Sequence, residues 1–239
     1  MSQLADNLNA IRARIKQLSV DAGRASDEVQ LIAVSKTRSL AEVEQAIVAG
    51  QTAFGENTIQ DALTKIPLLD NPDLQWHFIG HLQSKKAKPV AEHFQWIHTV
   101  DSLKLAQKLS AAMVQHNPQS VLNCLLQVNI TGEASKSGLS SNEAVSLLDE
   151  LQQQKLPNLA WRGLMTIGVN DDEAATRNAF SVLRMLRDHC RHKFNLKSFD
   201  QLSMGMSGDY DIAIQEGATM VRIGTELFGS RELNPPVKA

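Results

Sequence analysis

The segment that decides the fold is Leu31-Ile32-Ala33-Val34-Ser35-Lys36, an apolar run that ends at a lysine. Such a run is typical of a strand buried on both faces, as in a parallel sheet packed between helices. Ligands of α/β proteins bind outside the carboxyl ends of the strands, so Lys36 is a candidate binding residue. The alternative is a lysine that only extends its ammonium group into water.

Short apolar segments alternate with helical segments along the rest of the chain. Strands are predicted at 30–36, 52–55, 75–79, 96–100, 121–130, 159–167, 199–203 and 219–223. Capping boxes predict that helices begin at Ser39 and Ser140, and further helices are predicted over 57–66, 85–92, 102–116, from the acidic run at 171–173, and over 207–216. This alternation predicts a TIM (β/α)8 barrel.

An open doubly wound sheet is the alternative fold, because short strands are individually uncertain predictions. No GxGxxG follows a strand and no GxxxxGK[ST] occurs, which weighs against nucleotide-binding versions of that fold. Apolar residues from Leu4 to Leu18 recur at helical spacing and predict an extra N-terminal helix. We expect one domain over 1–239, with that helix at 1–23, the barrel at 30–230 and a loose tail at 231–239.

The composition predicts a soluble cytoplasmic protein. The 239 residues carry a formal charge of −2, which does not favour binding to nucleic acid or to an acidic membrane. We expect no membrane span and no targeting segment. Cys124 and Cys190 have no ligand-like spacing, so they are expected to be reduced and buried, and no metal site is predicted.

Two loops have the composition of a phosphate site. One is Ser203-Met204-Gly205-Met206-Ser207-Gly208 after the seventh strand, and the other is Gly224-Thr225 after the eighth. TIM barrels often bind phosphate with these two loops and a helix N-terminus. The alternative is two ordinary turns with Ser207 as a helix N-cap.

Lys36 and the phosphate loops would share one rim of a closed barrel, because strand eight pairs with strand one. A ligand with a carbonyl and a phosphate would span them and form a Schiff base with Lys36. Pyridoxal 5′-phosphate (PLP) and phosphorylated sugars have that shape. Arg222 would lie between amine and phosphate, where it could hydrogen-bond a pyridine nitrogen, although a salt bridge to a buried carboxylate is an alternative role.

Several motifs together resemble the pyridoxal-phosphate homeostasis proteins of the YggS/PROSC type. The matching segments are Ala33-Val34-Ser35-Lys36-Thr37, Phe54-Gly55-Glu56-Asn57, the stretch from His77 to Lys86, Arg162-Gly163-Leu164-Met165, Ser203-Met204-Gly205-Met206-Ser207 and Met220-Val221-Arg222-Ile223-Gly224-Thr225. The resemblance runs from the N-terminal helix to about Arg231. The stretch from Val221 to Gly229 is also similar to alanine racemase barrels, which implies a barrel like the alanine racemase N-terminal domain.

The resemblance implies roles for individual residues. Lys36 would be the Schiff-base lysine, and Arg222 would face the pyridine nitrogen. The phosphate would be held by Ser207, Gly224 and Thr225, with Ser203 and Gly208 in the same loops, and the ring would be lined by Asn57, His77 and Ile79. Lys85 departs from the family pattern, which usually has asparagine there, so its role stays open.

The expected acid/base groups are few. A fixed cation at the ring nitrogen disfavours protonation of that nitrogen and weakens the ring as an electron sink. Tyr210 is the single tyrosine, and its position beside the phosphate loop favours a packing role, while His77 and His81 are more often structural at such positions. We also expect no second domain that would complete a racemase site.

The sequence therefore predicts a monomeric PLP carrier that acts in intracellular PLP homeostasis without established turnover. Its partners would be PLP itself and PLP-dependent apo-enzymes. The alternatives are a PLP-dependent amino-acid racemase and an aldolase whose lysine attacks the substrate directly.

Overall fold

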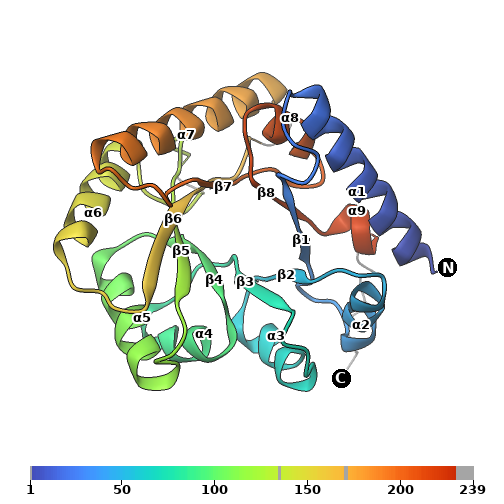
Figure 1. Cartoon of the computed structure of the whole chain (residues 1–239), viewed down its shortest axis with the longest axis horizontal. Helices are drawn as coiled ribbons and strands as arrows, with labels where there is room; N and C mark the ends of the chain where they lie inside the picture. Colours follow the sequence, from blue (N-terminus) through green and yellow to red (C-terminus); the bar gives the residue numbers. More distant parts are fainter. Residues whose placement is uncertain (1, 134–135, 170–171, 230–239) are drawn as a thin grey trace, which may run out of the picture.

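The computed structural model describes residues 2–133, 136–169 and 172–229. In these ranges eight parallel strands form a closed barrel in chain order, with helices around it (Figure 1). The TIM barrel predicted from the sequence is confirmed. The strands are β1 (Gln30–Val34), β2 (Ala53–Glu56), β3 (Gln75–Phe78), β4 (Trp96–Val100), β5 (Leu122–Gln127), β6 (Leu159–Met165), β7 (Gln201–Ser203) and β8 (Met220–Ile223).

The helices cover the outside of the barrel (Figure 1). They are α1 (Gln3–Asp21), α2 (Leu40–Val48), α3 (Ile59–Leu63), α4 (Ala87–His93), α5 (Leu103–His116), α6 (Ser141–Gln153), α7 (Glu173–Lys193), α8 (Tyr210–Gln215) and α9 (Thr225–Phe228), with 3-10 helices η1 (Ile66–Leu68) and η2 (Ser84–Lys86). Both predicted capping boxes are present, at Ser39 and Ser140. Each satisfies N–H groups that have no partner within the helix.

The barrel closes where the first strand meets the last. Gln30 pairs with Met220 and Ala33 pairs with Ile223, all in parallel register. On its other side β1 pairs with β2 through Ala33 and Val34. Since every strand is parallel, the carboxyl ends of β1, β7 and β8 lie on the same rim, which brings the segments after them together.

Helix α1 lies outside the barrel, as predicted, and packs against α2, α8 and α9. Its apolar residues Leu4, Leu8, Ile11, Ile15 and Leu18 are buried, and the Ser2 side chain caps its first turn. The side-chain amide of Asn7 donates to the carbonyl of Leu227 at 3.1 Å. Helix α1 is therefore attached to the side of the barrel that carries α8, α9 and α2.

Several boundaries differ from the predictions. Strand β1 ends at Val34, so Lys36 lies in the turn beyond it. The predicted helix over 57–66 is interrupted after Leu63, and Pro67 lies within η1, where its missing N–H is tolerated near the helix start. Helix α8 begins at Tyr210 and α9 was not predicted. The predicted tail (231–239) and Asp171 lie outside the described residues.

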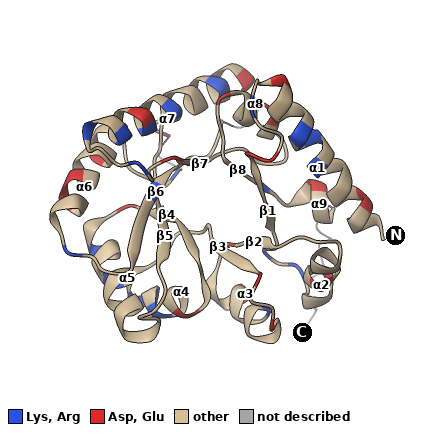
Figure 2. Ribbon diagram, viewed as in Figure 1, with Lys and Arg blue, Asp and Glu red and all other residues tan. Residues whose placement is uncertain are grey.

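Charged side chains lie mostly on the helices and loops around the barrel (Figure 2). Glu56, Lys65 and Arg222 differ from most charged residues of this protein in that their side chains are buried. Cys124 and Cys190 are buried free thiols, as predicted. None of the helices within the described ranges has the length and apolar character that crossing a bilayer requires.

Candidate functional site

The turn that carries Lys36 has an unusual backbone conformation. Lys36 is half-buried and follows Ser35, whose N–H donates to the carbonyl of Gly55 at 3.0 Å and so extends the contact between β1 and β2. The next residue, Thr37, has a φ of 63°, in the left-handed region that a β-branched residue rarely adopts. Such a conformation costs about 1–3 kcal/mol and persists only where neighbouring contacts enforce it.

The end of β8 lies against the end of β1. A Cβ atom added to Gly224 would lie 3.2 Å from the carbonyl oxygen and 3.3 Å from the Cβ of Val34. Beyond it, the Arg38 guanidinium donates to the carbonyls of Phe228 at 3.3 Å and Gly229 at 2.5 Å. The structure therefore brings the turn with Lys36 next to the predicted phosphate residues of the eighth loop.

The loops after β7 and β8 also contact each other. The backbone N–H of Glu226 donates to Ser207 Oγ at 3.5 Å, and the N–H of Arg222 donates to the carbonyl of Gly205 at 2.9 Å. Gly208 is exposed, and the space beside its Cα is open. Two neighbouring segments thus contain all the predicted phosphate residues, which are Ser203, Ser207, Gly208, Gly224 and Thr225.

Ser207 is not a helix N-cap, because α8 begins three residues later and its N-cap is Asp209. The side chain of Asp209 accepts from the N–H of Met206 at 2.5 Å and makes no capping bond to the helix. Asp209 therefore fixes the shape of the loop after β7. The short helix α9 begins directly after Gly224 and adds a helix N-terminus at this rim.

Arg222 on β8 lies in the barrel interior with 4% of its surface exposed. Its guanidinium donates to Ser203 Oγ at 2.6 Å and to the carbonyl of Thr166 at 2.9 Å. Among the described residues no carboxylate lies within ion-pair distance of the Arg222 guanidinium. The alternative role for Arg222, a salt bridge to a buried carboxylate, is therefore not observed in that part of the chain. Burial lowers the pKa of Arg222 to about 10, partly offset by the negative charge of Asp209.

Two buried histidines continue this polar row. His98 Nδ1 lies 2.8 Å from Ser203 Oγ, and His98 Nε2 lies 2.9 Å from His77 Nδ1. Burial lowers the pKa of His77 to about 3, and burial with the nearby His77 and Arg222 lowers the pKa of His98. Both imidazoles are therefore neutral near pH 7, and the row from His77 through His98 and Ser203 to Arg222 crosses the barrel.

His98 was missed from the sequence. The available signal was a polar residue in the middle of the apolar strand β4, which indicates a side chain that needs a buried partner. His77 was predicted to line a ligand ring, and its imidazole is fully buried on β3 and paired with His98.

Asn57 and Ile79 follow β2 and β3 at the same rim. Asn57 is exposed and Ile79 is half-buried. A Cβ on Gly80 would lie 1.8 Å from the carbonyl oxygen of Asn57, so only glycine permits this approach of the two segments. Lys85 is exposed in η2.

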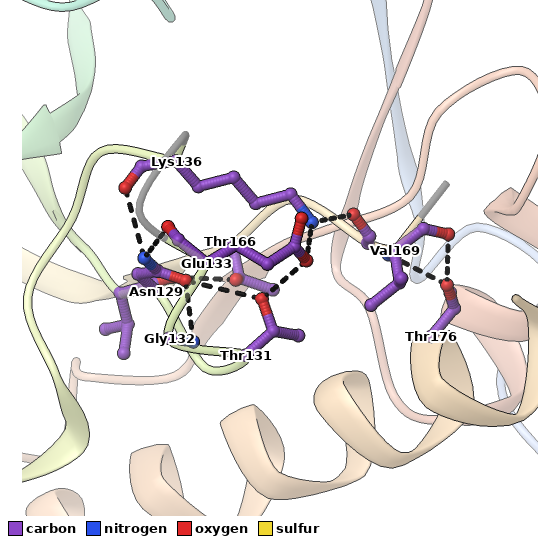
Figure 3. A network of polar contacts seen from close by, with 10 residues as sticks. Asn129, Thr131, Gly132, Glu133, Lys136, Thr166, Val169 and Thr176 are labelled. Carbon is purple, nitrogen blue, oxygen red and sulfur yellow. Dashed lines mark hydrogen bonds and ion pairs between the residues drawn. The ribbon is translucent and has the colours of Figure 1, made fainter. Parts of the chain in front are cut away.

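The loops after β5 and β6 form a separate polar network at the rim (Figure 3). Lys136 Nζ lies 2.6 Å from Glu133 and donates to the carbonyl of Gly168 at 2.8 Å. Asn129 Nδ2 donates to the carbonyls of Glu133 and Lys136, at 2.9 and 3.0 Å. An added Cβ on Gly168 would meet Asp209, so this network contacts the loop after β7.

Tyr210 is not placed as a free acid/base group. Its side chain is buried, and its hydroxyl donates to Glu226 at 3.2 Å. Burial and the negative charge of Glu226 raise the pKa of Tyr210 to about 12. These contacts agree with the packing role expected from the sequence.

The residues gathered here suit a ligand with a carbonyl at one end and a phosphate at the other. A lysine amine, serine and threonine hydroxyls, and glycine N–H groups lie on adjoining segments, and Gly208 leaves open space beside them. Arg222 is a buried cation held by neutral partners. Amines, hydroxyl groups and backbone N–H donors are the groups that aldehyde and phosphate recognition require.

Fold and site together define a barrel of the alanine racemase type. A family model described as "Alanine racemase, N-terminal domain" matches residues 7–232. An alanine racemase from Clostridium difficile superposes with a TM-score of 0.73 at 16% identity, over 97% of this chain and 57% of that one. That likeness shows the fold alone.

Nearer relatives narrow the family. The pyridoxal phosphate homeostasis protein of Pseudomonas aeruginosa is 48% identical over 238 residues, which is 99% of both chains. PipY of Synechococcus elongatus, solved with PLP bound, has a TM-score of 0.84 at 37% identity, over 95% of this chain and 100% of that one. The chain belongs to the pyridoxal phosphate homeostasis protein family.

Proposed function

We propose that this protein binds PLP through a Schiff base at Lys36 and acts as a PLP carrier in intracellular homeostasis. The names of its relatives and the PLP-bound PipY structure support this function. The structural observation that supports the assignment of Lys36 is the close approach of Gly224 to Val34, because it lies between the turn with Lys36 and one of the two predicted phosphate loops.

Each group has a stated task in this proposal. The neutral amine of Lys36 attacks the aldehyde carbon, a C=N bond forms and the carbonyl oxygen leaves as water. The hydroxyls of Ser207 and Thr225 and the N–H groups of Gly208 and Gly224 donate to the phosphate, and Arg222 donates to the pyridine nitrogen. Asn57, Ile79 and the end of β3 that carries His77 border the ring. When bound, PLP supplies an electron sink for amine chemistry.

The proposal includes the absence of turnover. A guanidinium at the ring nitrogen opposes protonation there, because two positive charges would be adjacent. Tyr210 donates to Glu226 and has a raised pKa, which makes it a poor proton acceptor near pH 7. His77 and His98 are bonded to each other inside the barrel. These contacts support the proposal that none of the three residues serves as an acid/base group for racemisation.

An absorbance experiment tests this function. The purified protein should be yellow with PLP, lose its visible band in Lys36→Ala, and after borohydride reduction carry the cofactor on Lys36 in peptide mapping. Lys85→Ala, which removes an exposed lysine, is the matched control and should stay yellow. Protein that stays colourless with added PLP would overturn the proposal and favour the aldolase, and racemisation of an amino acid would favour the racemase.

The proposal also covers the location of the protein, its oligomeric state and the transfer of PLP. We place the carrier in the cytoplasm as a single-domain monomer that delivers PLP to apo-enzymes. Mixing the PLP-loaded protein with a PLP-dependent apo-enzyme should restore that enzyme's activity faster than free PLP at the same total concentration. Equal rates would remove direct transfer from the proposal and leave a buffering role. Light scattering tests the monomer.

A further inference from the structure

A cluster of three ionisable side chains, two of them fully buried, contacts the turn that carries Lys36. The ammonium group of Lys65 has 1% of its side chain exposed and lies 2.7 Å from Glu56 Oε1 and 3.1 Å from Asp61 Oδ1. It also donates to the carbonyl of Ser35 at 2.9 Å. An ammonium group has three N–H donors, so these three acceptors use all of them.

The cluster holds the residues on both sides of Lys36. On one side, Ser35 Oγ donates to Glu56 Oε1 at 2.6 Å while the Ser35 carbonyl accepts from Lys65. On the other side, the N–H of Thr37 donates to Asp61 Oδ2 at 2.6 Å. Thr37 is the residue in the left-handed conformation, so the strained backbone next to Lys36 is fixed by a carboxylate of this cluster.

Stability alone does not explain such a cluster. Buried ion pairs often stabilise a fold no better than apolar residues of the same volume, because the charges lose their hydration. Glu56 Oε2 is buried and has no hydrogen-bond partner among the described residues, so the arrangement is not fully satisfied. A costly polar cluster beside a strained backbone is instead typical of a site that must hold one geometry.

We infer that Lys65, Glu56 and Asp61 position Lys36 for reaction with the carbonyl group of its ligand. The inference rests on the proposed function, since it takes Lys36 as the reacting amine. The three residues act through the backbone of Ser35 and Thr37 and are positioning residues. Their loss should impair formation of the C=N bond while leaving recognition of the phosphate intact, because the proposed phosphate residues lie in the loops after β7 and β8.

Two ligands separate these effects. PLP reports bond formation through its visible band, whereas pyridoxine 5′-phosphate has an alcohol in place of the aldehyde and reports only phosphate and ring binding. Asp61→Ala should weaken apparent PLP affinity about tenfold or more, as expected for a lost hydrogen bond to a charged group. Its affinity for pyridoxine 5′-phosphate, measured by calorimetry, should stay within about twofold of wild type.

Conservative and compensated variants complete the design. Asp61→Asn keeps an acceptor for the Thr37 N–H and should recover most of the PLP affinity. The double variant Lys65→Met/Glu56→Gln removes both fully buried charges together, so neither of them is left without the other, and it should lose PLP affinity as Asp61→Ala does. If that double variant does not fold, the comparison of Asp61→Ala with Asp61→Asn still tests the positioning role. We expect both to fold, because 26% of the Asp61 side chain is exposed.

Leu109→Ala is the control for general destabilisation, since it opens a cavity in helix α5 away from the turn. It should lower the melting temperature and leave both affinities unchanged. If Asp61→Ala leaves the PLP affinity unchanged, or lowers the affinity for both ligands equally, the positioning role is overturned. The proposed binding of PLP at Lys36 would still stand. A wild-type protein that forms no borohydride-trapped bond at Lys36 would instead overturn the proposed function and, with it, this inference.

Discussion

The hydroxyl of Ser203 accepts a 2.6 Å hydrogen bond from Arg222 and lies 2.8 Å from His98 Nδ1. A guanidinium has only donors, so Ser203 Oγ must be the acceptor toward Arg222. The proton of the serine hydroxyl can then be donated to His98, whose other nitrogen contacts His77. One small hydroxyl thus connects a buried cation to two neutral imidazoles.

Ser203→Ala should lower the free energy of unfolding by about 1–3 kcal/mol, because it leaves a buried N–H of Arg222 without an acceptor. Urea unfolding measures this loss. Ser110→Ala is the matched control, since Ser110 is a buried serine whose hydroxyl donates to an uncharged partner, the carbonyl of Pro157, at 2.8 Å. We expect a smaller loss there, and equal losses would argue against a special role for the Ser203–Arg222 bond.

Arg222→Gln should keep the Schiff base but shift its visible absorbance maximum. The reason is that the substitution changes the charge at the ring nitrogen and leaves the imine nitrogen unaltered. Spectra of the PLP-loaded variant test this, with borohydride trapping to verify that Lys36 is still modified. A spectrum identical to that of the wild type would remove Arg222 from the ring nitrogen.

Ser207→Asp should weaken PLP binding by at least about tenfold, since a carboxylate would face the phosphate at short range. Calorimetry with PLP and with pyridoxine 5′-phosphate should show the same loss for both ligands. Ser26→Asp introduces the same charge at an exposed position before β1 and is the control. If Ser207→Asp binds as well as that control, the phosphate lies elsewhere.

Burial raises the pKa of Glu56 to about 7 from an ordinary value of 4.5. As pH rises from 4.5 toward 7, the unfolded chain releases this proton before the folded chain does. Ionisation of Glu56 therefore lowers the free energy of unfolding over that window, by on the order of 3 kcal/mol, and adds no further slope well above pH 7. Thermal melts of the wild type and Glu56→Gln should diverge over this window, and parallel melts would contradict the raised pKa.

Burial lowers the pKa of His77 to about 3 from 6.5, which gives a slope of the opposite sign. As pH falls below about 6.5, the imidazole of His77 becomes protonated in the unfolded chain but stays neutral in the folded chain. The free energy of unfolding therefore decreases as the pH is lowered. His77→Gln should flatten this part of the stability profile. His189→Gln, a change on the outer helix α7, should retain the wild-type slope, and loss of the slope there would contradict the assignment to His77.

The order of strands and helices was predictable from the sequence because each element repeats its own apolar period. The strand Trp96–Val100 was predicted with its observed boundaries, and the helix predicted over 102–116 begins one residue later, at Leu103, after the N-cap Ser102. Local signals are sufficient there, since the cap and the apolar positions lie within the element itself. The position of Lys36 on the rim followed from the same pattern.

Other features depend on contacts between distant segments. Lys65 has no local sign of burial, and its partners Ser35 and Glu56 lie on other elements. The four-residue helix α9 is too short to show a period, and the start of α8 is displaced because Asp209 bonds to its own loop. His98 and Arg222 share a polar row only because β4 and β8 face each other inside a closed barrel. The individual ligand contacts of Lys36, Ser207 and Thr225 stay predictions.

The pairing of β1 with β8 has a consequence for synthesis of the chain. Gln30 pairs with Met220, and Asn7 donates to Leu227, so these residues find their partners in segments that are synthesised much later. Closing so long a loop is slow, and chains generally fold from the N-terminus as they emerge. The nascent barrel therefore keeps one edge of β1 unpaired until β8 has been synthesised, and the proposed site at the ends of these two strands forms only then.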